Sequence, residues 1–235
     1  MEKSLCNEIF ENIYLSLDQI LSLRSQKKIK DDGSYVTKGD LLVQDIIFNY
    51  FEDFHKNSFE IISEESMDFS IDFTKVNSVT VDPIDGTENF TSGLKEWGVS
   101  VSIYSKKKHI ESGILIPELG ESIISKKKVE KFESRVSGLS SNLTFSDIQS
   151  LSNNYEYRIT GCCVYNMLNV IKGSFKSFEN QKGANSWDIL AGLNLALEHE
   201  LIVLVNGENY NGQFLSPDKI YRNILSKKFI RNARG

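Results

Sequence analysis

The sequence of 235 residues is poor in the features that mark several large classes of protein. Its three cysteines are Cys6 and the adjacent Cys162 and Cys163, too few and too badly spaced for a disulfide framework, a zinc ribbon or a redox motif. This cysteine use fits a reducing compartment, and we expect a cytoplasmic protein. No stretch is apolar for the roughly 18 residues of a membrane span, and the first residues lack the pattern of a secretory signal. The sequence therefore predicts neither a membrane-spanning nor an exported protein.

The chain also lacks a surplus of positive charge. Its 27 Lys and Arg residues are outnumbered by 32 Asp and Glu residues, which gives a formal net charge of -5. A protein that binds a nucleic-acid polymer needs cations to neutralise phosphates, so the charge balance argues against that class. We interpret the lysine runs at 106–108 and 126–128 as solvated hairpin ends, rather than as a specific anion patch, because isolated charge runs usually face water.

Several catalytic motifs are missing as well. The chain contains no Walker A run and no Gly-x-Gly-x-x-Gly motif. Asp82 and Asp85 do not have the Asp-x-Asp-x-Thr spacing of haloacid-dehalogenase-type phosphatases, and Pro83 and Ile84 break the pattern of an EF-hand loop. No Ser or Cys partner motif accompanies the histidines, and we interpret them as surface or packing residues: His55, His109 and His199.

The sequence does contain alternating helical and strand patterns. Apolar residues at four-residue steps from Leu5 to Leu21 predict one amphipathic helix, followed by a loop at 24–34. Thr37 and Asp40 resemble a capping box that opens a second helix. Short strands that suggest an antiparallel sheet are predicted at 59–62, 79–82, 97–104, 113–117 and 122–124. The second half predicts helices at 165–171 and 187–197, strands near 175–178 and 201–205, and a turn near Asn209.

The stretch 79–90 is the most informative part of the chain. Pro83 cannot donate to a sheet ladder, so the strand is predicted to end at Asp82. Asp85 and Gly86 permit a tight turn, and Thr87 can cap a short helix. Two carboxylates would then face the backbone N–H groups of a helix start. Such a junction can hold a cation, an anion or both.

Acidic residues stand at four predicted element ends. They are Asp40, the pair Glu64 and Glu65, the pair Asp82 and Asp85, and Asp188. Each by itself is more often a helix cap or a surface residue than a ligand. Together they supply hard oxygen ligands without a His/Cys set, which suits Mg²⁺ better than zinc.

These motifs resemble one known family. Asp82-Pro83-Ile84-Asp85-Gly86-Thr87, preceded by Ser63-Glu64-Glu65-Ser66 and followed by Trp187-Asp188, resembles the inositol monophosphatase family of Mg²⁺-dependent, often lithium-sensitive phosphatases. Weaker matches extend the resemblance from about Val36 to Ala196. It implies an α/β (α+β) fold, a layered α/β/α/β/α sandwich. We expect one catalytic domain over 1–235, with an N-terminal lobe of about 1–128 and a C-terminal lobe of about 129–235. Relatives are commonly dimers, so a homodimer is expected.

The resemblance also implies roles for individual residues. Glu64, Asp82 and the Ile84 carbonyl resemble the ligands of a first Mg²⁺, and Asp82, Asp85 and Asp188 those of a second, while Glu64 would hold a third through water. Glu64, Thr87 and Asp40 match the catalytic residues, of which Thr87 and Asp40 help to orient and deprotonate the attacking water, and the N–H groups of Gly86 and Thr87 would hold the phosphate. Substrate contacts are implied for Asp85, Gly161, Cys162, Cys163, Glu179 and Asp188. The implied reaction is direct attack of a metal-activated water on a small phosphate monoester.

Departures from the family pattern bear on the substrate. Glu179 stands farther before Asp188 than the corresponding acid usually does, and 180–183 are interpreted as a local insertion that reshapes the pocket. Glu88-Asn89-Phe90 differs from the Lys-Glu-Phe of the nucleotide branch, which favours an inositol, sugar or polyol monophosphate. A 3′(2′),5′-bisphosphate nucleotidase is the main alternative, ahead of a fructose-1,6-bisphosphatase or a histidinol phosphatase. A non-catalytic relative that binds metal and phosphate is the alternative from a different class.

Overall fold

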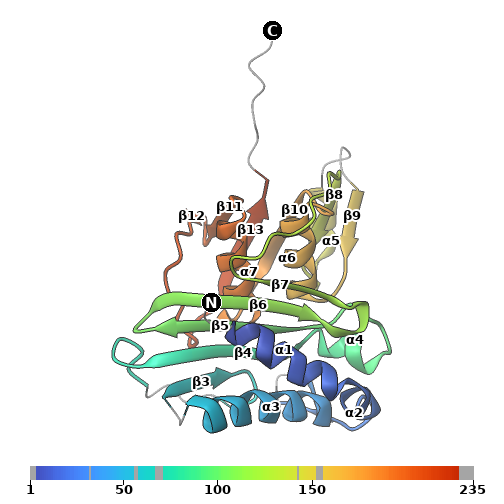
Figure 1. Ribbon diagram of the computed structural model, residues 1–235. Coiled ribbons are helices and arrows are strands. Elements are labelled where there is room, and N and C mark those ends of the chain that lie inside the picture. Colours follow the sequence, from blue (N-terminus) through green and yellow to red (C-terminus); the bar gives the residue numbers. More distant parts are fainter. Residues whose placement is uncertain are drawn as a thin grey trace.

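The structure is a computed structural model that describes residues 4–31, 33–55, 58–66, 71–141, 143–151 and 156–227. Residue 32 of the predicted loop and the side chain of His55 lie outside the described part. Two β-sheets are stacked with helices between them and on the far side of the first sheet (Figure 1). No helix in the described part of the chain is long and apolar enough to cross a membrane.

The first sheet has five strands in the order β3-β4-β5-β6-β7. Its strands are β3 (Phe59–Ser63), β4 (Asn77–Asp85), β5 (Gly98–Ser105), β6 (Lys108–Ile116) and β7 (Glu121–Ile124), with the 3₁₀ turn Pro117–Leu119 between the last two. The strands β3 and β4 run parallel and the others antiparallel, so the predicted antiparallel sheet is in fact mixed. The helices α1 (Leu5–Leu15), α2 (Leu17–Ser22) and α3 (Lys38–His55) cover one face and bury an apolar core against it (Figure 1).

The second sheet has six strands in the order β12-β11-β13-β10-β8-β9. They are β8 (Val136–Leu139), β9 (Glu156–Ile159), β10 (Ser177–Ala184), β11 (Ile202–Val205), β12 (Glu208–Asn209) and β13 (Tyr221–Ser226). The helices α6 (Cys163–Lys172) and α7 (Ser186–Glu198) lie between the two sheets and contact both. An ion pair between Asp147 and Lys182 joins β10 to the short helix α5 (Phe145–Gln149). This succession of layers confirms the predicted fold class.

The predicted helix over 5–21 is interrupted at Ser16. Residues four apart advance about 400° around a helix, so a stripe at four-residue steps drifts by about 40° at each step. Over four steps the stripe would leave the buried face. The break at Ser16, whose N–H bonds back to Ile13 O, returns Ile20 to the core, while Leu15 is left 87% exposed.

The segment predicted as a loop forms a small hairpin instead. Its strands β1 (Lys27–Ile29) and β2 (Tyr35–Thr37) pair antiparallel. In the tail, β12 and β13 were not predicted. The strand β4 also continues past Asp82, because a bulge between Asp82 and Asp85 accommodates Pro83 where no ladder hydrogen bond is needed.

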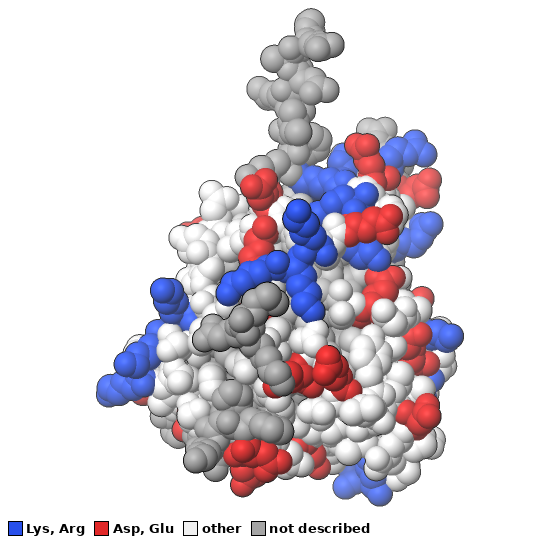
Figure 2. All heavy atoms as spheres, in the orientation of Figure 1, with Lys and Arg blue, Asp and Glu red and all other residues white. Residues whose placement is uncertain are grey.

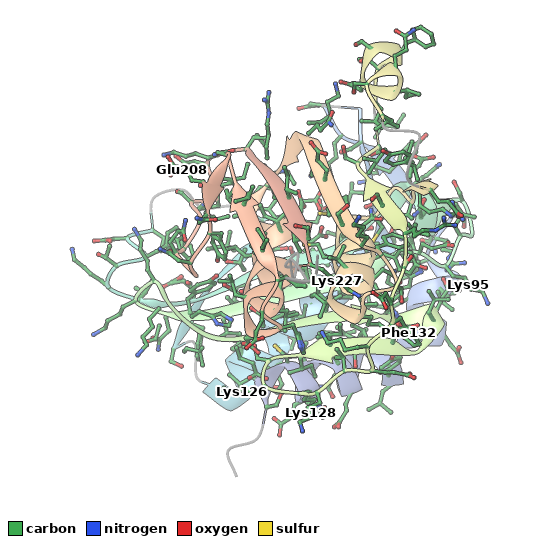
Figure 3. All side chains as sticks on the ribbon, turned by 90° about the horizontal axis from the view of Figure 1, so that it is seen from above. Lys95, Lys126, Lys128, Phe132, Glu208 and Lys227 are labelled. Carbon is green, nitrogen blue, oxygen red and sulfur yellow. The ribbon has the colours of Figure 1, made fainter. Side chains whose placement is uncertain are left out.

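The two lysine runs occupy different positions. Lys106 and Lys107 form the turn of the β5–β6 hairpin, as predicted. Lys126 and Lys128 are exposed, but they follow β7 where the chain leaves for the second sheet, so this run is not a hairpin end (Figure 3). Figure 2 shows basic side chains gathered on the upper part of one face, the part of the molecule that holds the second sheet in Figure 1.

Candidate metal and phosphate site

The ends of several elements meet around a cavity of about 290 Å³. Residues from the ends of β3 and β4, from the starts of α4 (Thr87–Thr91), α6 and α7, and from β10 line it. Most of the residues predicted for the site lie here: Glu64, Asp82, Ile84, Asp85, Gly86, Thr87, Gly161, Cys162, Cys163 and Asp188. A larger cavity of about 740 Å³ runs along β10, β11 and β13, but it contains none of these residues. The carboxylates, and not the cavity size, therefore identify the site.

Three carboxylates form the centre of the site. One oxygen from each of Glu64, Asp82 and Asp188 lies within 4.8 Å of the others. The parallel register of β3 on β4, extended by the bond from Glu64 N–H to Val81 O, places Glu64 beside Asp82. Asp188 lies in the first turn of α7, where its Oδ2 accepts a hydrogen bond of 2.7 Å from Asn185 N–H. Three segments far apart in sequence thus converge on one cation-sized space.

The electrostatics of this cluster call for a cation. Burial, and then the neighbouring Glu64, Asp85 and Asp188, raise the pKa of Asp82 well above its usual value. Burial and the carboxylates of Asp85 and Glu64 likewise raise the pKa of Asp188. Like charges held this close favour protonation unless a cation compensates them. Since all the ligating atoms are carboxylate oxygens, this donor set fits Mg²⁺.

Asp85 has a second function in the structure. Its Oδ2 accepts hydrogen bonds from Val164 N–H at 2.5 Å and from the Cys162 thiol at 3.2 Å, which fastens the start of α6 to the end of β4. Burial raises the pKa of Asp85 to about 6. Burial and Asp85 also raise the pKa of the Cys162 and Cys163 thiols, so both stay protonated, as expected of packing residues rather than of redox groups.

The predicted pair of Thr87 and Asp40 is present. Thr87 Oγ1 lies 3.0 Å from Ile84 O and 3.4 Å from Asp40 Oδ1. Thr87 does not cap its helix, however. Gly86 takes that position with φ 83°, and Thr87 is the first helical residue. The predicted capping box of α3 is confirmed, because Thr37 N–H donates to Asp40 Oδ2 and Thr37 Oγ1 accepts from Asp40 N–H.

Lys30 is a neighbour of the site that the sequence did not reveal. Its Nζ lies 2.7 Å from Glu64 Oε1 and 2.7 Å from Glu65 Oε1. Burial opposes the charge of Lys30, but the two glutamates outweigh it and raise its pKa. Burial raises the pKa of Glu65 to about 7 despite this partner. The contact between Lys30 and Glu64 could not be predicted, because residues 24–34 have the composition of a polar loop. The hairpin β1–β2 brings Lys30 to the end of β3.

Glu179 is not among the residues that line the site. It lies on β10 and lines the 740 Å³ cavity, where its Oε1 accepts a hydrogen bond from Gln181. Residues 180–183, interpreted as an insertion, belong to β10 and contain its bulge. The structure instead brings unpredicted residues to the site, among them Ser34, Ser140, Ser141, Asn180, Lys182 and Asn185. His109 and His199 are not among the residues that line the site.

Comparisons with known proteins agree with the fold and identify the family. The sequence model of the Inositol monophosphatase family matches residues 7–135. An IMPase/NADP phosphatase solved with Mg²⁺ and phosphate is 20% identical, with a TM-score of 0.78 over 95% of this chain and 89% of that chain. A Ca-bound IMPase family protein from Staphylococcus aureus is 18% identical, with a TM-score of 0.78 over 97% and 92%. The IMPase TM1415 of Thermotoga maritima is 22% identical, with a TM-score of 0.74 over 92% and 90%. No curated protein sequence matches the chain.

Proposed function

The chain belongs to the inositol monophosphatase family, and from this premise we propose that it is a Mg²⁺-dependent phosphatase that hydrolyses a small phosphate monoester of an inositol, sugar or polyol. The observation that carries the proposal is the convergence of Glu64, Asp82 and Asp188 beside the pair of Thr87 and Asp40. Metal ligands alone could serve a binding protein. A hydroxyl with a buried carboxylate behind it, next to those ligands, is what a hydrolase needs to direct a water.

The side chains divide the work as follows. Glu64, Asp82, Asp85, Asp188 and the Ile84 carbonyl would hold two or three Mg²⁺ ions. Bound Mg²⁺ supplies positive charge that neutralises a phosphate dianion and lowers the pKa of water. The backbone N–H groups at the start of α4 would hold the phosphate. Asp85 also binds the start of α6 through the hydrogen bond from Val164 N–H.

The hydroxyl of Thr87 has one proton and two acceptors. The shorter contact is to Ile84 O at 3.0 Å, and the longer one is to Asp40 Oδ1 at 3.4 Å. If Ile84 O were a Mg²⁺ ligand, the Thr87 hydroxyl would donate to Asp40 instead, and its oxygen would be free to accept a hydrogen bond from the attacking water. Asp40 thus orients Thr87, and Thr87 orients the water.

Other properties of the proposed enzyme come from the resemblance and from composition. The family implies a homodimer and sensitivity to Li⁺, and one structural neighbour was solved as an inhibitory complex with LiCl. The cysteine use supports a cytoplasmic location. A cavity of about 290 Å³ is at the small end for ligand sites, which supports a compact substrate.

Phosphate release from a panel of substrates tests the proposal. The panel contains inositol phosphates, hexose phosphates, glycerol phosphate, histidinol phosphate and adenosine 3′,5′-bisphosphate, each with Mg²⁺, with EDTA and with added Li⁺. We expect release from at least one sugar or polyol ester, abolished by EDTA and reduced by Li⁺. Absence of release from every compound would overturn the proposal in favour of a non-catalytic relative.

A further inference from the structure

The walls of the cavity differ in charge. The four carboxylates come from the first sheet and from the start of α7: Glu64, Asp82, Asp85 and Asp188. The wall that the second sheet contributes is lined by Ser140, Ser141, Phe178, Asn180 and Lys182 and has no carboxylate. Lys182 is the only Lys or Arg among the described residues that line the cavity. A phosphate ester whose phosphate meets the carboxylate side must therefore present the rest of its alcohol to a wall with one cation.

The sequence predicted an acid at this wall. An acid accepts hydrogen bonds from the hydroxyls of a sugar, and Glu179 was expected to do so. Because side chains alternate along a strand, Glu179 and Gln181 line the cavity along β10, β11 and β13, while Phe178 and Asn180 are buried and line the substrate cavity. Asn180 also borders the larger cavity. Lys182, two residues after Asn180, lines both cavities, and its ammonium group is paired with Asp147 of the larger one. The wall of the substrate cavity thus contains a lysine and no carboxylate, and the ammonium group of this lysine lies at the border between the two cavities.

Within the described ranges, three residues that line the cavity have a buried polar atom without a hydrogen-bond partner: Ser140 on this wall, Asn166 on α6 and Trp187 on α7. Of these atoms, Ser140 Oγ and the indole N–H of Trp187 are hydrogen-bond donors. A buried donor without an acceptor is unfavourable, so a ligand that supplies one gains affinity. The indole nitrogen can only donate, which favours an oxygen-rich, electron-rich ligand group.

The present partner of Lys182 would release it readily. Lys182 Nζ lies 2.9 Å from Asp147 Oδ2, and the two side chains are 40% and 23% exposed. An ion pair this accessible to water contributes little to stability. Asp147 Oδ2 also accepts hydrogen bonds from Thr144 N–H and Thr144 Oγ1, at 2.7 and 2.6 Å, so it keeps partners when the ammonium leaves.

We propose that Lys182 makes the enzyme selective for phosphate esters whose alcohol carries a second anionic group, such as a second phosphate or a carboxylate. This inference rests on the proposed phosphatase function and narrows its substrate class. The hydrolysed phosphate lies on the carboxylate side of the cavity, and the second anion pairs with the ammonium of Lys182 on the opposite wall. A charge-assisted hydrogen bond of this kind typically changes affinity by about 10- to 100-fold.

Matched substrates test the inference. We compare fructose 1-phosphate with fructose 1,6-bisphosphate, and glycerol phosphate with 2-phosphoglycerate, at fixed Mg²⁺ and low salt. In each pair, the wild-type protein is expected to show the higher kcat/KM for the member that carries the second anionic group. In Lys182→Met, which keeps the aliphatic stem, we expect that preference to fall by about 10- to 100-fold, chiefly through KM. Lys182→Arg should restore most of it, and the control Lys219→Met, at an exposed lysine outside the cavity, should not change it.

The outcomes separate the two proposals. A wild-type preference for the monophosphate, or an equal loss on both members of a pair in Lys182→Met, would refute the role of Lys182 while leaving the phosphatase intact. If no compound is hydrolysed, the phosphatase proposal fails. Calorimetry of the same pairs with Ca²⁺ then tests whether Lys182 binds the second anionic group. The anion contact is supported if the wild-type protein binds the bisphosphate more tightly than the monophosphate and Lys182→Met does not. It is excluded if the wild-type protein and Lys182→Met bind the bisphosphate equally.

Discussion

At the scale of single residues, the site is a set of carboxylates held together at an energetic cost. Asp82 is 1% exposed, and its nearest charged neighbours are the carboxylates of Glu64, Asp85 and Asp188. Residues that are arranged for chemistry rather than for stability often show this pattern, because their raised pKa values reflect repulsion within the folded chain. The same repulsion makes the protein's stability depend on cations and on pH.

Replacing Asp82 separates these effects. In Asp82→Asn we expect phosphate release to fall by roughly 1,000-fold or more, because an amide cannot hold two cations and about 4 kcal/mol of charge stabilisation is lost. We expect the metal-free variant to melt at a higher temperature than the wild-type protein, since one buried charge is gone, and Mg²⁺ should raise its melting temperature less. Melting curves with EDTA and with Mg²⁺ measure both effects. The exposed Asp45→Asn on α3 is the control, and full activity in Asp82→Asn would contradict the metal site.

Asp40 predicts a pH dependence of stability. Burial raises its pKa from 3.8 to about 6. Between those values the folded chain binds more protons than the unfolded chain, so stability falls as the pH rises from about 4 to about 6, by on the order of 3 kcal/mol from this group. Asp40→Asn removes the contribution. Urea unfolding of the metal-free proteins between pH 4 and 7 should therefore show a flatter profile for the variant, and parallel profiles would disprove the raised pKa.

At the scale of elements, the junction of β4 and α4 sets the geometry of the site. A bulge carries β4 past Pro83 to Asp85, and Gly86 then turns the chain with φ 83°, in the left-handed region that favours glycine. A Cβ at Gly86 would lie 3.0 Å from Cys162 Cβ and 3.3 Å from Glu96 O. The turn thus needs glycine both for its backbone conformation and for the close approach of α6.

Two glycine variants distinguish these requirements. Gly93 follows α4 with φ 78°, but no atom lies within 4 Å of the Cβ that alanine would add. Gly93→Ala should therefore lower the free energy of unfolding only by the conformational strain of alanine at a positive φ, about 1 kcal/mol. Gly86→Ala should cost about 2 to 3 kcal/mol and also lower kcat, because the start of α4 and Asp85 must shift. Urea unfolding and phosphate release measure the difference, and equal effects of the two variants would show that crowding against α6 is unimportant.

At the scale of the whole molecule, α7 joins the two sheets. Asn194, 3% exposed, donates from Nδ2 to the Tyr104 hydroxyl of β5 at 2.6 Å and accepts from the Tyr210 hydroxyl at 2.8 Å. These bonds connect the first sheet through α7 to the segment after β12. The start of the same helix carries Asp188 into the site, so the packing of α7 positions a ligand as well as the core.

Asn194→Ala tests this connection. The substitution leaves two buried tyrosine hydroxyls short of partners, and we expect a loss of about 2 kcal/mol in the free energy of unfolding. Asn169→Ala on α6, where the side chain bonds to Tyr165 O of its own helix, should change stability much less. Urea unfolding followed by the fluorescence of Trp97 and Trp187 reports on both parts of the chain. An Asn194→Ala variant as stable as the wild-type protein would show that the network carries no net stability.

Local patterns in the sequence determined most elements and the composition of the metal site. The capping box at Thr37 and Asp40 and the position of Asp188 in the first turn of α7 depend on neighbouring residues, and each is found in the structure. The acids at element ends could be identified for the same reason. Glu64, Asp82 and Asp188 then meet because the first sheet and α7 bring those ends together.

Only the tertiary structure decided which side chains face the substrate. The face to which a strand residue points depends on register and on bulges, and one extra residue moves the following side chains to the opposite face. Glu179 lies outside the site, whereas Lys182 lines both the site and the larger cavity. Lys30 is likewise brought to Glu64 by a hairpin whose strands the sequence pattern did not reveal. The sequence alone thus determined which residues form the metal side of the site. Long-range packing decided which residues form the wall that would contact the alcohol part of the substrate.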